Sequence, residues 1–143
     1  MPASYSIDAR LGVVFSRRWG VVTNEELIAN ARVLARDPRF RPTFRQLADL
    51  RHVESLAVTA AGIRELAQLN PFSKEARRAG VVGSDVSFGV LRMYQSSLSA
   101  GAEDILVAHT MAEALKWLGL DPSTPWPAES ADFVSEGTET RRC

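Results

Sequence analysis

Residues that commonly carry out catalysis are few in this sequence, and they lie far apart. His52 and His109 have no cysteine, histidine or clustered acid at the spacing of metal ligands. Cys143 is the single cysteine, and no base accompanies it that would make it a nucleophile. Neither a glycine-rich phosphate loop nor a Gly-x-Ser-x-Gly turn occurs. We therefore expect a protein that is not an enzyme, with no cofactor and with no catalytic or metal-binding residues.

A cluster of polar residues follows the strand that we predict over residues 46–50. Asp49, Arg51, His52 and Ser55 fall at the end of this strand or just beyond it. Ligands of open α/β sheets bind outside the carboxyl ends of the strands. These residues are therefore candidates for binding a partner. The alternative interpretation is that Asp49 only tethers the loop that follows it.

A second group lies on a helix predicted over residues 85–98. Phe88, Leu91, Arg92 and Tyr94 bring two aromatic rings, an aliphatic side chain and a guanidinium within two helical turns. They are candidates for lining a pocket that holds a small apolar or anionic ligand between the helix and the sheet. The other interpretation is that the apolar members simply belong to the core.

Seven basic side chains in the middle of the chain form a candidate anion-binding face, and solvated surface charges are the alternative. They are Arg39, Arg41, Arg45, Arg51, Lys74, Arg77 and Arg78. We do not expect this face to stack on nucleic-acid bases.

Composition and charge exclude several classes of function. The 143 residues are 45% hydrophobic and 24% charged, which is typical of one globular domain. Seventeen basic residues balance seventeen acidic ones, so no net charge favours nucleic acid or a membrane surface. No apolar run is long enough to span a bilayer, and the first residues lack the pattern of a secretory signal. We expect a cytoplasmic protein with no nucleic-acid partner and no integral membrane association.

Local patterns predict the order of strands and helices. Alternation over residues 5–8 and 12–19 predicts an opening hairpin. Thr23 and Glu26 have the spacing of a capping box, which predicts that a helix begins there. Further strands are expected at residues 46–50, 79–82 and 105–108, with helices beginning at Thr59, at Ser84 or Asp85, and at Thr110.

Strands and helices thus alternate after the hairpin, which is typical of an α/β fold. We predict a single domain over residues 1–119 with a mainly parallel sheet of four to five strands and four helices. The hairpin would form an antiparallel edge of this sheet. Residues 120–143 lack periodicity and are rich in Pro, Ser, Thr and Glu, so we predict a flexible acidic tail there.

The order and spacing of several segments resemble the STAS domains, the anti-sigma-factor antagonist family, and especially its SpoIIAA-like branch. The resemblance covers about residues 5–119. It is carried by Trp19-Gly20-Val21-Val22-Thr23, by Asp49 after an apolar strand, by Ala79-Gly80-Val81-Val82, by Phe88-Gly89 with Arg92-Met93-Tyr94, and by Ala114-Leu115-Lys116-Trp117-Leu118-Gly119. It implies a four- or five-stranded sheet with helices largely on one side, and a role in protein–protein regulation or small-ligand sensing.

In STAS regulators a serine that follows an aspartate, at the start of the second helix, is phosphorylated by a partner kinase. The resemblance implies that Thr59 is the phospho-acceptor here, although Val58 stands in the place of the acid and Gly62 comes one position late. A phosphate on Thr59 would be stabilised by the helix N-terminus. The alternative is that Thr59 is a plain N-cap.

Two hypotheses of function follow. The first is a non-enzymatic regulatory module that binds another protein through residues 49–62, with Gly62 among the contacts. An exposed apolar patch at Val53, Leu56 and Val58 would favour it. The second is a sensor or carrier of a small apolar or anionic ligand, which a pocket lined by the four candidate helix residues would favour. The edge of the first hairpin would also allow a homodimer.

Overall fold

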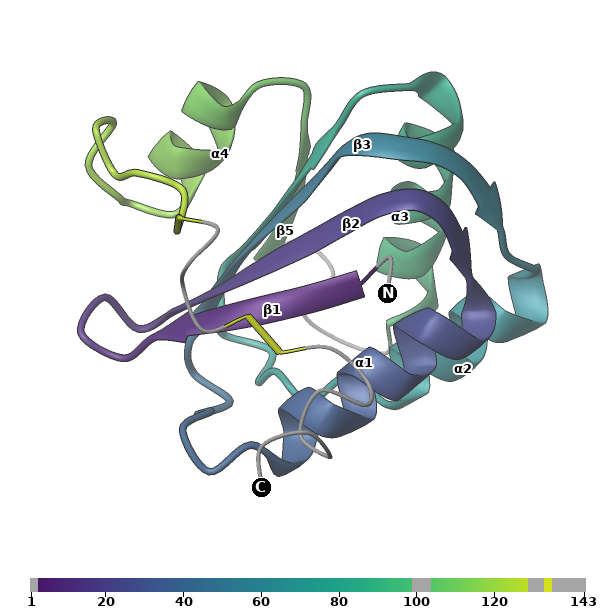
Figure 1. Ribbon diagram of the computed structural model, residues 1–143, viewed down its shortest axis with the longest axis horizontal. Helices are drawn as coiled ribbons and strands as arrows, with labels where there is room; N and C mark the ends of the chain where they lie inside the picture. Colours follow the sequence, from purple (N-terminus) through teal and green to yellow (C-terminus); the bar gives the residue numbers. More distant parts are fainter. Residues whose placement is uncertain (1–2, 99–103, 129–132, 135–143) are drawn as a thin grey trace.

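Five strands and four helices make up the computed structural model, which describes residues 3–98, 104–128 and 133–134 (Figure 1). In chain order they are β1 (Ala3–Asp8), β2 (Val13–Thr23), α1 (Asn24–Arg36), β3 (Arg45–Ala57), α2 (Ala60–Gln68), β4 (Arg78–Val82), α3 (Asp85–Ser97), β5 (Ile105–Ala108) and α4 (Met111–Trp117). The elements follow one another in the order that the sequence predicts.

One mixed sheet contains all five strands in the order β1-β2-β3-β4-β5. The β1–β2 pair is antiparallel, and every later pair is parallel. Because parallel neighbours need a crossover connection, α1, α2 and α3 each join one strand to the next. The predicted α/β class, with an antiparallel opening hairpin, a mainly parallel sheet and four helices, is confirmed.

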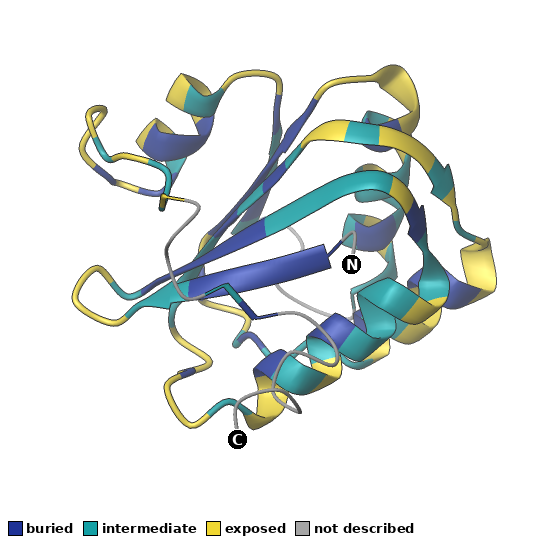
Figure 2. Cartoon of the chain, viewed as in Figure 1, coloured by how far each residue is buried: buried dark blue, intermediate teal, exposed yellow. Residues whose placement is uncertain are grey.

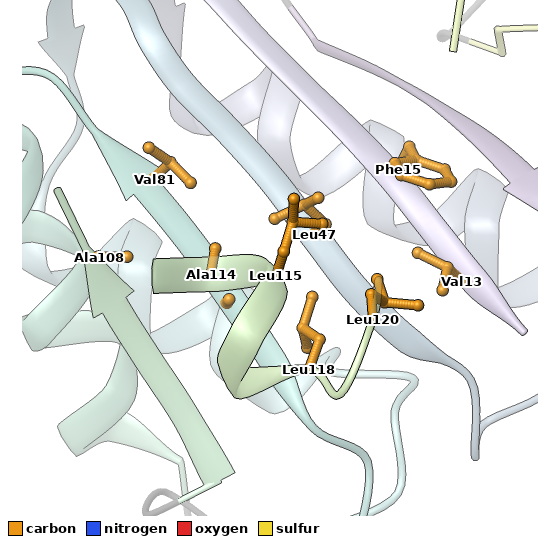
Figure 3. Packing of buried hydrophobic residues seen from close by; sticks show 10 residues of the cluster. Val13, Phe15, Leu47, Val81, Ala108, Ala114, Leu115, Leu118 and Leu120 are labelled. Atoms are coloured by element: carbon orange, nitrogen blue, oxygen red, sulfur yellow. The ribbon is translucent and has the colours of Figure 1, made fainter. Parts of the chain in front are cut away.

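The two faces of the sheet are covered by different helices. Side chains alternate along a strand, so Val13 and Phe15 point to one face while Val14 points to the other. α4 covers the first face through Ala114 and Leu115 (Figure 3). α1, α2 and α3 cover the opposite face, where their buried side chains form two further clusters. Three helices therefore share one side of the sheet.

β3 is much longer than the strand predicted over residues 46–50. Its second half, residues 51–57, pairs with β2 alone among the described residues, because β4 ends opposite Leu50. Most of its side chains are exposed (Figure 2), so they do not show the alternation of apolar and polar residues that indicates a strand. β2 likewise runs on to Thr23, with Gly20 at a φ of +65° beside an irregularity in the pairing.

Side-chain caps begin the helices at the predicted positions. The Thr23 hydroxyl accepts a hydrogen bond from the backbone N–H of Glu26, whose carboxylate accepts from the N–H of Thr23. Thr59, Ser84 and Thr110 also accept from the backbone at the starts of α2, α3 and α4. Such caps depend on four consecutive residues, so they can be predicted without knowledge of tertiary contacts.

Part of the segment predicted as a tail lies against the domain. Trp126 packs edge-on against Phe15, with ring centroids 5.4 Å apart. Val134 exchanges two backbone hydrogen bonds with Tyr5, of 2.9 and 2.6 Å, at the outer edge of β1. Residues 129–132 and 135–143 of the predicted tail, Cys143 included, lie outside the described residues.

Candidate functional site

A cavity of about 120 Å³ lies between the sheet and helices α1, α2 and α3. Its walls are mostly apolar, and they include Leu50 from β3, Leu66 from α2 and Leu91 from α3. Small side chains on facing elements, Ala31 of α1 and Ala48 of β3, also line the space. Longer side chains at these two positions would fill it, so the cavity depends on alanine at both.

Gly80 of β4 determines how closely α3 approaches the sheet. Leu91 occupies the space in which a Cβ of residue 80 would lie. A glycine in a strand commonly marks such a close approach. One helical turn after Leu91, the Tyr94 hydroxyl accepts a hydrogen bond of 2.9 Å from Nη2 of Arg78. The glycine thus brings α3 within reach of a charged side chain of β4.

Arg78 lines this apolar cavity and is only 9% exposed. Its guanidinium donates to three neutral acceptors at 2.9 to 3.0 Å, namely Gln46 Oε1, Asn70 Oδ1 and the Tyr94 hydroxyl. It also lies over the ring of Phe72, 4.4 Å from the centroid. These contacts hold the charge in place, but none of them neutralises it.

Arg18 lines the same cavity from β2. Its Nη1 donates to the backbone carbonyls of Ser4 (3.3 Å) and Arg17 (3.1 Å), and its guanidinium makes no other hydrogen bond to the described residues. Burial lowers the pKa of Arg18 from 12.5 to about 10, because the charged form loses hydration. Tyr94 opposes this change in the pKa, whereas the positive charge of Arg78 adds to it. The partly buried Arg18 and the buried Arg78 are therefore close enough to repel each other.

No negative charge compensates the two arginines within the described part of the chain. None of the residues that line the cavity is acidic, and neither Arg18 nor Arg78 takes part in an ion pair there. Asn30 of α1 also lines the cavity, is 3% exposed, and has an Nδ2 that finds no acceptor among the described residues. Apolar walls thus surround an uncompensated positive charge and an unused hydrogen-bond donor.

Two of the four residues that the sequence suggested for a pocket line this cavity. Leu91 and Tyr94 contribute to its wall, whereas Phe88 and Arg92 do not. The Phe88 ring stacks instead on the ring of His109, with centroids 5.3 Å apart, and the Arg92 guanidinium lies 5.9 Å from the centroid of Phe88. This second group belongs to the edge of the molecule where β5 ends.

Sequence reasoning did not single out Arg18 or Asn30, and it treated Arg78 as one of several surface charges. A weak signal for Arg18 is present in the spacing of β2. Val14 is buried on the side of helices α1 to α3, and Arg18 follows it at an even interval. Strict alternation therefore turns Arg18 toward the helices.

Asp49 is buried, at 5% exposure, and its carboxylate forms an ion pair with Arg51. Arg51 donates from Nε and Nη2 to the two carboxylate oxygens at 3.0 Å each, and its backbone N–H donates to Oδ1. Burial by itself would raise the pKa of Asp49, but these hydrogen bonds and the charge of Arg51 hold it below its ordinary value. Of the partner-binding candidates on β3, Arg51, His52 and Ser55 are exposed and Asp49 is not.

Thr59 is exposed at the start of α2, and its hydroxyl accepts two hydrogen bonds. The donors are the backbone N–H of Gly62 and Nδ2 of Asn24, each at 3.0 Å. Gly62 is buried beneath Asn24, since a Cβ at residue 62 would overlap the Asn24 amide. A surface groove of about 460 Å³ between α1 and α2 runs past these residues and past Arg32 and Glu65. Gly62 therefore serves the contact between α1 and α2, while Thr59 faces the groove.

The apolar residues expected to mark an interaction patch are partly buried. Leu56 lines the cavity, and Val58 packs against the cluster formed by α2, α3 and β5. The large apolar side chains that are exposed in the described residues are scattered ones: Leu11, Val21 and Val86. They do not form one patch in the region of residues 49–62.

The described residues contain no group of three or more His, Cys, Asp or Glu side chains that could hold a metal ion. Among the helices described, none is long and apolar enough to cross a membrane. No protein-family model matches the chain, and no match was found among curated proteins or among solved structures. The function is therefore inferred from the geometry of the cavity and of the exposed surfaces.

Proposed function

We propose that this protein is a sensor or carrier that binds a small, largely apolar molecule in the cavity between the sheet and helices α1 to α3. The observation that supports the proposal is the cavity itself, with its predominantly apolar wall. Protein interiors are close-packed, so a cavity of about 120 Å³ leaves the side chains of its wall without the contacts of a packed core. A bound molecule would restore those contacts.

The volume limits the size of the molecule. An apolar cavity of about 150 Å³ in another protein stays dry and binds benzene. At about 120 Å³, this cavity matches a single ring or a short branched chain, and it is too small for a drug-sized ligand.

Toluene is a suitable probe for this proposal. We expect it to raise the free energy of unfolding by about 2.7 kcal/mol at 100 times its Kd, measured by urea denaturation at several toluene concentrations. Ala48→Leu is the matched control, because it adds apolar volume to the wall of the cavity and should abolish the effect of toluene. The proposal is wrong if toluene leaves the wild type unchanged, or if it stabilises Ala48→Leu equally.

A second candidate function, binding another protein as a regulatory module, is favoured by the open edge of β3. Among the described residues, 51–57 pair with β2 on one side only. Arg51, His52 and Ser55 are exposed along this stretch. An exposed strand edge can accept an extended segment of a partner through backbone hydrogen bonds.

Native mass spectrometry of the protein purified from its own cells tests this second candidate. A partner bound at the edge should be retained by the wild type and lost from Ser55→Lys, because lysine on an edge strand opposes pairing. Ser96→Lys changes an exposed residue of α3 and should retain the partner. Equal retention by both variants would place the partner elsewhere.

A further inference from the structure

We infer that the molecule bound in the cavity carries a carboxylate, which the guanidinium of Arg18 receives beside Arg78 and the Asn30 amide. This inference rests on the proposed function and adds the chemical class of the ligand to it. The inference is argued from the polar groups in the wall of the cavity, whereas the proposed function is argued from the volume of the cavity and its apolar residues.

The first step concerns charge. Buried charged groups in proteins are paired, because an isolated ion loses far more hydration energy than an apolar interior returns. Arg18 and Arg78 share one cavity whose lining contains no acid, and within the described residues neither forms an ion pair. An anionic ligand would supply the missing negative charge.

The second step concerns hydrogen bonding, which distinguishes the two arginines. Arg78 uses Nε, Nη1 and Nη2 on Gln46, Asn70 and Tyr94, and so it is held in position by the protein. Arg18 uses only Nη1, on two backbone carbonyls. Its Nε and Nη2 therefore remain available, with respect to the described residues, for an acceptor in the cavity. A planar guanidinium with free donors matches the two oxygens of a carboxylate.

The third step concerns the remaining donor. Nδ2 of Asn30 is buried and makes no hydrogen bond to a described residue, which is unfavourable for a buried amide. Asn30 and Arg18 both line the cavity, so one carboxylate could accept from both side chains. Phosphate fits less well, since most of the wall is apolar and would leave its additional oxygens without donors.

The experiment compares three probes of similar size on the full chain by isothermal titration calorimetry. Benzoate has the ring and the charge, benzamide has the ring and a neutral polar group, and toluene has the ring alone. We expect benzoate to bind at least about tenfold more tightly than benzamide, because charge-assisted hydrogen bonds are about twice as strong as neutral ones. Inorganic phosphate, as a fourth probe, should bind at least about tenfold more weakly than benzoate.

Single substitutions identify which residues cause the preference for benzoate over benzamide. Arg18→Met should reduce the benzoate-to-benzamide preference to about twofold or less, while toluene binds as before, because only the charged donor is removed. Asn30→Leu, of similar volume, should weaken benzoate several-fold and spare toluene, which gives a second measurement should Arg18→Met fold poorly. Arg64→Met removes an exposed arginine of α2 and should keep the full preference.

The outcomes separate the two proposals. If toluene binds and benzoate and benzamide bind equally, the carboxylate inference is overturned while the proposed function stands. If toluene does not bind, the proposed function is overturned, and the carboxylate inference that rests on it is overturned with it. If the preference for benzoate survives in Arg18→Met and in Asn30→Leu, the anion does not bind where we place it. A stronger affinity for phosphate than for benzoate would also overturn the assignment to a carboxylate.

Discussion

Arg18 keeps its charge inside an apolar wall, and burial lowers its pKa to about 10. In the absence of a ligand, such a charge destabilises the folded state, since it has lost part of its hydration and, among the described residues, gained hydrogen bonds to two carbonyl groups only. Functional sites often retain residues of this kind at the expense of stability.

Replacing Arg18 should therefore make the unliganded protein more stable. We expect Arg18→Met to raise the free energy of unfolding by up to about 1 kcal/mol, because a partly buried and unpaired charge is exchanged for an apolar side chain. Urea denaturation at neutral pH measures this change, and Arg64→Met should stay within about 0.5 kcal/mol of the wild type. A large loss of stability in Arg18→Met would mean that the arginine mainly supports the fold.

Asp37, unlike Arg18, carries a charge that neighbouring groups compensate, so this charge stabilises the folded state. Hydrogen bonds from the Arg39 side chain lower the pKa of Asp37 from 3.8 to about 2, burial opposes this, and the Arg39 backbone and the Tyr5 hydroxyl lower it further. The folded-state pKa is below the unfolded one. The stability that this group contributes is therefore complete above about pH 4, and it is lost as the pH falls from about 4 to 2.

Asp37→Asn should accordingly lower the free energy of unfolding at neutral pH by about 1–2 kcal/mol, a value that allows for the exposure of Arg39 to solvent. It should also remove part of the acid dependence between about pH 4 and 2. Urea titrations across this pH range give both quantities. Glu54→Gln neutralises an exposed carboxylate of β3, and it should leave stability and acid dependence nearly unchanged.

Among the elements, the contact between α1 and α2 is sensitive to a single methyl group. Gly62 lies directly beneath the Asn24 amide, which also exchanges two hydrogen bonds with Thr59. Alanine normally favours a helix over glycine, by about 1 kcal/mol. Here the overlap with Asn24 should reverse the sign of that effect.

We expect Gly62→Ala to cost about 1–3 kcal/mol of stability, and to cost much less in an Asn24→Ala background, where the overlapping amide is absent. Thermal or urea unfolding of the four proteins of this cycle measures the coupling. Gly89→Ala on α3 is the matched control. No atom lies within 4 Å of a Cβ at that position, so it should gain up to about 1 kcal/mol. Additive effects of Gly62→Ala and Asn24→Ala would contradict the contact.

Elements that depend on neighbouring residues could be predicted from the sequence, whereas those that depend on tertiary contacts could not. The caps at Thr23, Thr59 and Thr110 are local, and the helices begin where these caps indicate. Residues 51–57 of β3 are largely exposed, so they lack the pattern of a buried strand. In the cavity, Leu91 and Tyr94 follow from helical spacing, but the burial of Arg78 depends on three partners that are 8 to 32 residues away.

At the scale of the whole molecule, the segment after α4 contributes to the core. Trp126 packs against the α4 cluster and meets the ring of Phe15 edge-on. Trp126→Ala should lower the free energy of unfolding by about 1–3 kcal/mol, less than for a fully buried tryptophan because Trp126 is partly exposed. Urea denaturation followed by circular dichroism measures it. Leu11→Ala, at a side chain that is 38% exposed, should change stability by less than about 0.5 kcal/mol, and a similarly small effect for Trp126 would contradict its packing role.

The strand order β1-β2-β3-β4-β5 repeats the order of the strands along the chain. During synthesis, each new strand therefore meets an edge that the preceding strand has already provided, and no strand has to be inserted between two others. The pairing of Val134 with Tyr5 is the exception, because it joins the end of the described chain to its first strand. Closing the long loop between these two residues costs conformational entropy, which makes the contact slow to form. We therefore expect the sheet to assemble vectorially, and the Val134–Tyr5 bridge to form last.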